Sequence, residues 1–174
     1  MKRICAVLLL AVITTIATAS PITGLLERID RGASKKFIIE EVKSDTDFFE
    51  LDQKGNRVVI RGNNSVSIAT GLNWYLKYYA GIHLSWNGMT ATLPDVLPPV
   101  MKKEHHETKL PWRYDLNYCT YSYSMAFWDW ERWEKEIDWM ALHGVNLPLA
   151  ITGTETVWYN VLQKLGYNKT EINE

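Results

Sequence analysis

From residue 111 onward, strand-like and helix-like segments alternate, and this alternation limits the possible folds more than any other feature of the chain. Residues 145–151 form a near-continuous apolar run, which is typical of a parallel strand buried on both faces. The expected order is strand, helix, strand, helix and the start of a third helix, at residues 112–119, 128–143, 145–151, 154–165 and from 168. Parallel strands joined by helices are the repeating unit of α/β barrels and doubly wound sheets.

Two such units cannot close a barrel, which needs eight strands. Two parallel strands on their own would leave both edges unpaired and an apolar face exposed. The sequence therefore predicts an α/β fold that is truncated: the first two βα units of a barrel whose remainder is not in this chain.

The helices of this region are expected to pack through one apolar face. In the helix at 128–143 the apolar stripe consists of Trp130, Trp133, Ile137, Met140 and Ala141. In the next helix the inward side chains are expected to be Val157, Trp158, Val161, Leu162 and Leu165. The acidic residues of the first helix are expected on its solvated face, namely Glu131, Glu134, Glu136 and Asp138.

Residues 20–93 predict a small α+β domain. Ile22, Leu25, Leu26 and Ile29 recur at helical spacing and indicate a short opening helix. Apolar and β-branched runs predict strands at 37–42, 48–51, 57–61 and 82–86, and one-sided apolar spacing predicts a helix at 65–80. Gly71 lies inside this helix, where glycine costs stability, and close packing on the sheet would explain its presence.

Residues 94–110 are expected to be an interdomain linker, because three prolines are followed by a polar run. This interpretation separates residues 20–93 from a second domain at 111–174. The adjacent His105 and His106 are expected to point in opposite directions on an extended chain, so a solvated linker is favoured over a metal site.

The first 19 residues resemble a secretory signal peptide. Lys2 and Arg3 precede an apolar run at 6–13, and Ala17-Thr18-Ala19 is an A-x-A cleavage signal. The run is shorter than the ~20 residues that span a bilayer. We therefore expect cleavage before Ser20, no stable membrane insertion afterwards, and a secreted or periplasmic protein.

Cleavage would leave 17 basic and 20 acidic residues, which are spread along the chain and give no nucleic-acid footprint. It would also leave Cys119 as the only cysteine, so no internal disulfide is expected. A buried apolar thiol and a pocket thiol both fit this composition, and the composition alone favours the buried thiol. The sequence predicts no cofactor and no metal site.

Two stretches of the second region resemble the start of the barrel in the α-N-acetylglucosaminidase family, glycoside hydrolase family 89. They are residues 113–124, RYDLNYCTYSYS, and residues 127–147, which contain the tryptophan-rich run WDWERWEKEIDWMAL. Residues 69–76 and 83–86 are similar to the small amino-terminal domain of the same family.

The resemblance implies a small α+β domain, a TIM barrel and a helical carboxy-terminal domain. It also implies retaining exo-hydrolysis of terminal α-linked N-acetylglucosamine by two glutamates, one as acid/base and one as nucleophile. Both glutamates lie downstream of this segment in the family, so no catalytic residue is assigned here. The expected partners are a glycan with that terminal sugar and the rest of the enzyme.

The segment is expected to supply part of the sugar pocket, because the active site of a TIM barrel faces the carboxyl ends of its strands. The candidate substrate-binding residues are Asn117, Cys119, Tyr123 and Glu155. For Asn117 and Tyr123 the alternative is structural bonding at the strand end. Glu155 also falls in the first turn of a helix, where its charge would interact well with the dipole, and this structural role is favoured over a catalytic one.

Two alternatives remain open from the sequence. One is a related hydrolase with the same domain order, such as a β-hexosaminidase or an α-glucuronidase, although these are not expected to carry the tryptophan-rich run. The other is a non-catalytic secreted carbohydrate-binding protein made of this chain alone.

Overall fold

The structure, a computed structural model, describes residues 20–151 and 153–173. The expected signal peptide at 1–19 lies outside the described residues, so its cleavage stays a prediction. In the described part of the chain, no helix is long and apolar enough to cross a membrane.

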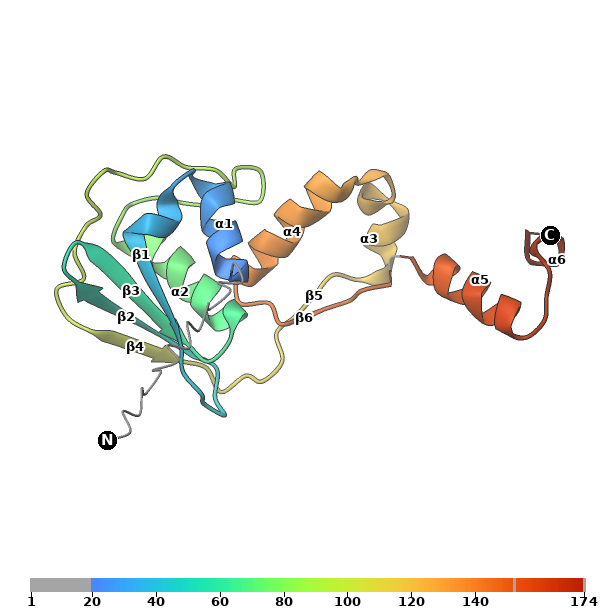
Figure 1. Ribbon diagram of the computed structural model, residues 1–174, viewed down its shortest axis with the longest axis horizontal. Helices are drawn as coiled ribbons and strands as arrows, with labels where there is room; N and C mark the ends of the chain where they lie inside the picture. The colour runs from blue at the N-terminus through green and yellow to red at the C-terminus, as the bar shows by residue number, and fades with distance from the viewer. Residues whose placement is uncertain (1–19, 152, 174) are drawn as a thin grey trace, which may run out of the picture.

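The first domain is a four-stranded sheet covered by helices (Figure 1). The strand order is β1-β3-β2-β4, with β1 parallel to β3 and the other neighbours antiparallel. Its elements are α1 (Pro21–Ile29), a 3₁₀ turn (Ala33–Lys36), β1 (Phe37–Glu41), β2 (Phe48–Lys54), β3 (Arg57–Gly62), α2 (Ser65–Tyr78) and β4 (Glu104–Glu107).

The expected opening helix is confirmed as α1, and its four apolar residues are all buried. Helix α2 packs on β2 and β3 and also contacts α1. Between these elements lies one hydrophobic core, which includes Leu51 and Ile60 from the sheet and Leu72 and Leu76 from α2. Local apolar spacing therefore predicted both helices correctly.

The strand expected at 82–86 is wrong. The chain instead makes a tight turn, in which Ser85 and Gly88 exchange backbone hydrogen bonds of 3.0 Å. Leu84 is fully buried in the core, so the apolar character of this segment reflects packing of an irregular loop and not a strand.

Much of the segment expected as a solvated linker belongs to the first domain. Leu97 and Val100 are buried in its core, and the Tyr75 hydroxyl donates a 2.7 Å hydrogen bond to the Pro98 carbonyl. Residues 104–107 form β4, the edge strand beside β2. A polar run fits an edge strand as well as a linker, because an edge strand needs few apolar residues.

His105 and His106 do point to opposite faces of β4, as expected for an extended chain. His105 stacks on Phe48 with ring centroids 5.2 Å apart, and His106 stacks on Phe49 at 4.8 Å. Within the described residues, no group of three or more His, Cys, Asp or Glu side chains is placed to hold a metal ion.

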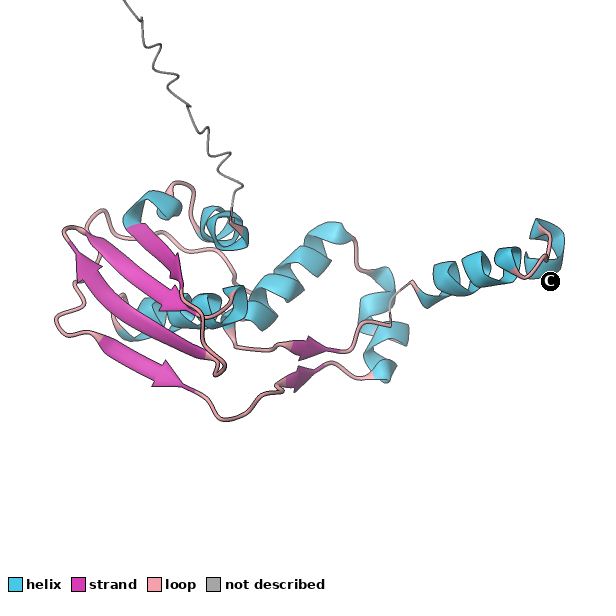
Figure 2. Cartoon of the chain, turned by 60° about the horizontal axis from the view of Figure 1, so that its bottom comes forward, coloured by secondary structure: helices cyan, strands magenta, loops and turns pink. Residues whose placement is uncertain are grey.

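The second region contains two parallel strands with helices after each (Figure 2). Its elements are β5 (Tyr114–Asp115), α3 (Tyr118–Ser122), a 3₁₀ turn (Ser124–Phe127), α4 (Trp130–Leu142), β6 (Leu147–Pro148), α5 (Thr154–Lys164) and α6 (Lys169–Asn173). The expected βαβα order is present. The strand expected at 112–119 is much shorter, however, because residues 118–122 form α3.

Helix α4 packs on α2 of the first domain. Its expected solvated face is wrong for two residues, since Glu136 is 3% exposed and Asp138 is 8% exposed. Asp138 accepts two hydrogen bonds from Arg28 of α1, at 2.6 and 2.7 Å. The acidic residues therefore bind the first domain.

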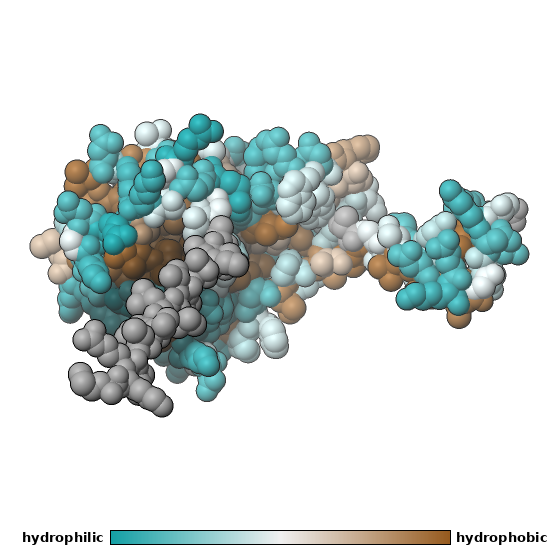
Figure 3. Space-filling view, in the orientation of Figure 1, coloured by the Kyte–Doolittle hydropathy of each residue, from teal (hydrophilic) through white to brown (hydrophobic). Residues whose placement is uncertain are grey.

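The expected apolar faces are only partly covered. Trp130 and Ile137 of α4 are 69% and 47% exposed. Helix α5 extends away from the other elements together with α6, and hydrophobic side chains lie on its surface (Figure 3). None of its residues is buried, so the inward packing expected for Val157 and Trp158 is absent from the described structure.

Candidate functional site

The carboxyl ends of β5 and β6 lie at one edge, because the two strands are parallel. Tyr114 pairs with Leu147 and Asp115 with Pro148, and the Leu149 N–H donates to the Asp115 carbonyl at 3.0 Å. In a TIM barrel this edge faces the active site. The residues that follow each strand are therefore the candidates for contact with a ligand.

A strained turn carries the chain out of β5. Leu116 has a φ of 68°, and it is the only residue other than glycine with positive φ in the described part of the chain. The Asp115 carboxylate accepts a 2.7 Å hydrogen bond from the Leu116 N–H and helps to hold this conformation. Backbone strain of this kind costs about 1–3 kcal/mol and tends to occur at functional sites.

Asn117 comes directly after this turn and caps α3. Its Oδ1 accepts hydrogen bonds from the backbone N–H groups of Cys119 at 2.9 Å and Thr120 at 3.3 Å. No hydrogen bond among the described residues uses its Nδ2 group. The cap therefore fixes the side chain while leaving an amide donor at the strand edge.

Cys119 lies in the first turn of α3 and not in the strand, and its thiol is exposed. The buried alternative for this thiol is thus wrong in the described structure. Tyr123 ends α3 and is 73% exposed. One short helix that follows β5 thus carries all three residues, with Asn117 at its N-cap, Cys119 in its first turn and Tyr123 at its C-cap.

Glu155 lies in the first turn of α5, which begins after Gly153. Its side chain is exposed, and no hydrogen bond or ion pair among the described residues joins it to Asn117 or Tyr123. The placement fits the favoured interaction of its charge with the helix dipole. Its contact with substrate stays a prediction.

Sequence reasoning did not single out Tyr121, which lies in α3 and lines a groove together with residues that follow β5 and β6. Tyr121 stacks on Trp133 with ring centroids 6.0 Å apart, and burial raises the pKa of its hydroxyl. The two rings line an apolar groove of about 430 Å³ with Leu116, Trp130, Ile137, Met140, Pro148, Leu149 and Ala150. The tyrosine-rich motif indicated aromatic side chains near the strand end. It did not indicate that Tyr121 is half-buried while Tyr118 and Tyr123 are exposed.

A larger depression of about 770 Å³ lies at the other end of β5, and Asp45, Asn64, Lys109 and Trp112 are among its lining residues. Trp112 precedes the strand, so this depression is at the amino end of β5. It is therefore not the candidate sugar pocket, which the fold places at the carboxyl end.

Comparison with known proteins defines the class of this chain. Residues 20–99 match the N-terminal domain of α-N-acetylglucosaminidase, and residues 113–174 match its TIM-barrel domain. The fold is thus a small α+β domain followed by the start of a glycosidase TIM barrel. The chain belongs to the α-N-acetylglucosaminidase family, glycoside hydrolase family 89.

Human α-N-acetylglucosaminidase is 48% identical over 118 residues, which are 68% of this chain and 16% of the human protein. A family 89 glycoside hydrolase from Clostridium perfringens, solved in complex with PUGNAc, matches 87% of the chain with 40% identity and a TM-score of 0.77. The same enzyme with two glutamate-to-glutamine substitutions, in complex with its substrate GlcNAc-α-1,4-galactose, gives a TM-score of 0.78. This chain spans only 18% of those structures.

Proposed function

We propose that this chain acts as part of a secreted retaining exo-glycosidase that releases terminal α-linked N-acetylglucosamine. The observation that carries the proposal is the position of Asn117, fixed by its cap at the carboxyl edge of β5 in a chain of this family. A strand end of a TIM barrel is where such an enzyme holds its substrate.

In this proposal Asn117 donates its amide hydrogens to an oxygen of the terminal sugar. Tyr123 supplies an aromatic face and a hydroxyl, and Cys119 forms part of the pocket wall. The exposure of all three side chains supports this role, because each can reach a ligand without a change of fold.

The residues that break the bond are proposed to lie outside this chain. A retaining glycosidase needs two carboxyl groups about 5–5.5 Å apart, one as nucleophile and one as acid/base. The family resemblance implies that both lie downstream of this segment. A helical domain and the remaining barrel strands are the proposed partners, and the signal-like segment supports export to the periplasm or beyond.

A hybrid enzyme tests the proposal directly. Residues 20–174 replace the matching segment of the C. perfringens enzyme, and hydrolysis of an aryl α-N-acetylglucosaminide is measured. We expect turnover by the hybrid and none by the 174-residue chain alone, which lacks the proposed carboxylate pair. A folded hybrid without turnover would contradict the proposal, and turnover by the chain alone would contradict the placement of the glutamates.

The substitution Asn117→Ala in the hybrid tests the pocket assignment. Loss of one hydrogen bond to a sugar should raise KM by about 2- to 12-fold, since such a bond contributes about 0.5–1.5 kcal/mol. Asp45→Ala, in the exposed loop before β2, is the matched control and should leave KM unchanged. An unchanged KM for Asn117→Ala would remove Asn117 from the pocket.

A further inference from the structure

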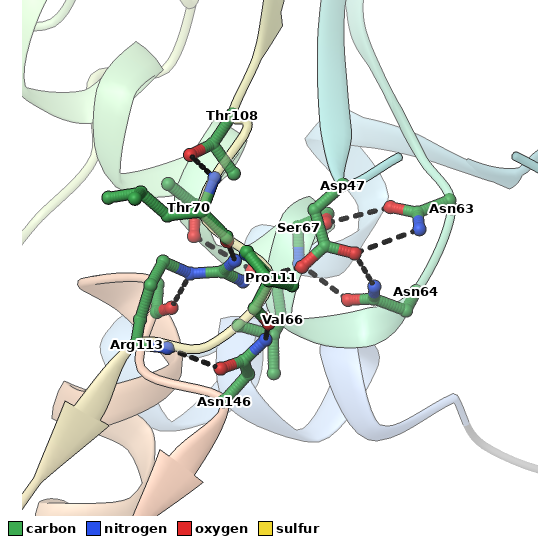
Figure 4. A network of polar contacts seen from close by, with 12 residues as sticks. Asp47, Asn63, Asn64, Val66, Ser67, Thr70, Thr108, Pro111, Arg113 and Asn146 are labelled. Carbon is green, nitrogen blue, oxygen red and sulfur yellow. Dashed lines mark hydrogen bonds and ion pairs between the residues drawn. The ribbon is translucent and has the colours of Figure 1, made fainter. Parts of the chain in front are cut away.

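Arg113 joins the two domains immediately before β5 (Figure 4). Its Nη2 donates to Asp47 Oδ2 at 2.5 Å, its Nε to the Gly144 carbonyl at 2.5 Å, and its Nη1 to the Leu110 carbonyl at 2.8 Å. One guanidinium therefore ties together the loop before β2, the segment before β5 and the end of α4.

The backbone of Arg113 is held as firmly as its side chain. Its N–H donates to Asn146 Oδ1 at 2.9 Å, and its carbonyl accepts from the N–H groups of Asn146 and Leu147 at 3.2 Å. The Asn146 amide also donates to the Pro111 carbonyl at 2.9 Å. These bonds fix the register of β5 against β6.

Asp47, the partner on the first domain, is itself rigidly placed. It accepts hydrogen bonds from the Nδ2 groups of Asn63 at 2.9 Å and Asn64 at 2.7 Å. Asn64 is the N-cap of α2 and accepts from the Ser67 N–H. The ion pair is about four-fifths buried at both ends, so it is screened less than a surface pair.

We propose that Arg113 is a positioning residue for the sugar pocket: by fixing β5 to the first domain, it sets the place of Asn117. The proposal rests on the proposed function. Asn117 follows Arg113 by four residues, at most ~13 Å of extended chain. Between them lie the two residues of β5 and the left-handed Leu116, so a shift at Arg113 reaches Asn117 with little to absorb it.

Strand β5 is too short to hold this position alone. Among the described residues it pairs only with β6, over two residue pairs. The anchor at Arg113 thus supplies most of the polar contacts that orient the strand end. A displacement of about 1 Å at a ligand-binding group can lower catalytic efficiency as much as 10²-fold.

A double-mutant cycle in the hybrid enzyme tests this proposal. The variants are Arg113→Ala, Asn117→Ala and the two combined, with KM and kcat measured for each on the aryl α-N-acetylglucosaminide. We expect Arg113→Ala to raise KM by about 2- to 12-fold, the same range that is expected for Asn117→Ala. We also expect the KM of the double variant to be no more than about 2-fold higher than the KM of Asn117→Ala, because both changes remove the same contact.

The proposal would be overturned if the effects of Arg113→Ala and Asn117→Ala on KM multiply. It would also be overturned if Arg113→Ala leaves KM unchanged. Arg28→Ala is the matched control, since it removes the ion pairs of α1 with Asp138 and Glu134 but acts on α4 and not on β5. Arg28→Ala should leave KM within about 2-fold of the value for the unsubstituted hybrid. Its effect on KM should multiply with the effect of Asn117→Ala.

If Arg113→Ala gives no folded hybrid, Asp47→Asn provides the same cycle, because it keeps the size of the side chain and removes its charge. The unsubstituted hybrid separates the two hypotheses. If it is folded and inactive, the proposed function fails; if it is active and the cycle shows independent effects, only the positioning role fails.

Discussion

Trp86 and Glu136 are joined across the boundary between the first domain and α4 by a 2.7 Å hydrogen bond from the indole Nε1 to Oε2. The same carboxylate oxygen accepts from Arg132 Nη2 at 3.0 Å. The Arg132 guanidinium lies over the Trp86 ring at 4.5 Å and over the Trp128 ring at 3.9 Å. Glu136 therefore links α4 to the first domain, and we call the group of Trp86, Trp128, Arg132 and Glu136 the clamp.

Replacing Glu136 by alanine should lower the free energy of unfolding by about 2–4 kcal/mol. The substitution removes a buried carboxylate, and it leaves the largely covered Arg132 guanidinium without its charged partner and the Trp86 N–H without its acceptor. Urea unfolding followed by tryptophan fluorescence measures the change. Glu131→Ala is the control, because its exposed pair with Lys135 should contribute under ~1 kcal/mol; equal losses for both variants would rule out the clamp.

The clamp also shows what the sequence could and could not predict. Apolar spacing identified α1, α2, α4 and α5, because a helix that packs on a core repeats its apolar residues at a fixed interval. The same reasoning placed Glu136 and Asp138 in solvent. Their partners, Trp86 and Arg28, are 50 and 110 residues away in the chain, and no local pattern reports such a contact.

The candidate site was predicted in part for a related reason. Family resemblance and the rule for strand ends selected Asn117, Cys119 and Tyr123, and the structure places these residues on α3 or at its caps. The tight change from strand to helix could not be predicted, because leucine rarely adopts the positive φ found at Leu116. The wrong strand at 112–119 follows from that single residue.

Substitutions at Gly71 of α2 and Gly24 of α1 test whether close packing outweighs the low helix propensity of glycine. A Cβ added to Gly71 of α2 would lie 3.0 Å from Ile60 Cγ2 and 3.0 Å from Phe49 Cβ, both in the core. Gly71→Ala should therefore destabilise by about 1–3 kcal/mol, even though alanine favours a helix. This contact supports the expected reason for a glycine at this position.

Gly24→Ala in α1 is the matched change. Its Cβ would meet only Arg28 Nη1, at 3.1 Å, the end of a side chain that can move. Alanine should then stabilise by up to about 1 kcal/mol. The melting temperatures of both variants measure these changes in stability. A higher melting temperature for Gly71→Ala would show that α2 is not in close contact with the sheet.

Acid should weaken the bond between Asp47 and Arg113. Burial alone would raise the pKa of Asp47, but hydrogen bonds from Asn63, Arg113 and Asn64 and the Arg113 charge lower it below its ordinary value. A carboxyl with a lowered pKa stabilises the folded state above its unfolded pKa of about 3.9, and this stabilisation is lost as the pH falls through the lowered value.

At pH 6, Asp47→Asn should thus have a lower melting temperature than the unsubstituted chain. This gap between the two melting temperatures should narrow below about pH 4. Melting temperatures at pH 6, 5, 4 and 3 measure it. Asp45→Asn, two residues earlier and exposed, should show no gap at any pH. A gap for Asp47→Asn that is the same at pH 6 and pH 3 would mean that the carboxylate charge contributes nothing.

The exposed apolar side chains of α4 and α5 should make this chain associate with itself. Trp130, Val157, Trp158 and Leu165 are 61–70% exposed, and grouped apolar surface of this kind drives association. Val157→Lys combined with Trp158→Lys should shift the chain toward monomer in light scattering at rising concentration. Tyr78→Lys changes an aromatic residue at the end of α2 that is 58% exposed and lies beside Trp74 and β4, and it should leave association unchanged. Equal effects of the two changes would point to total hydrophobicity, and not to the uncovered faces of α4 and α5, as the cause.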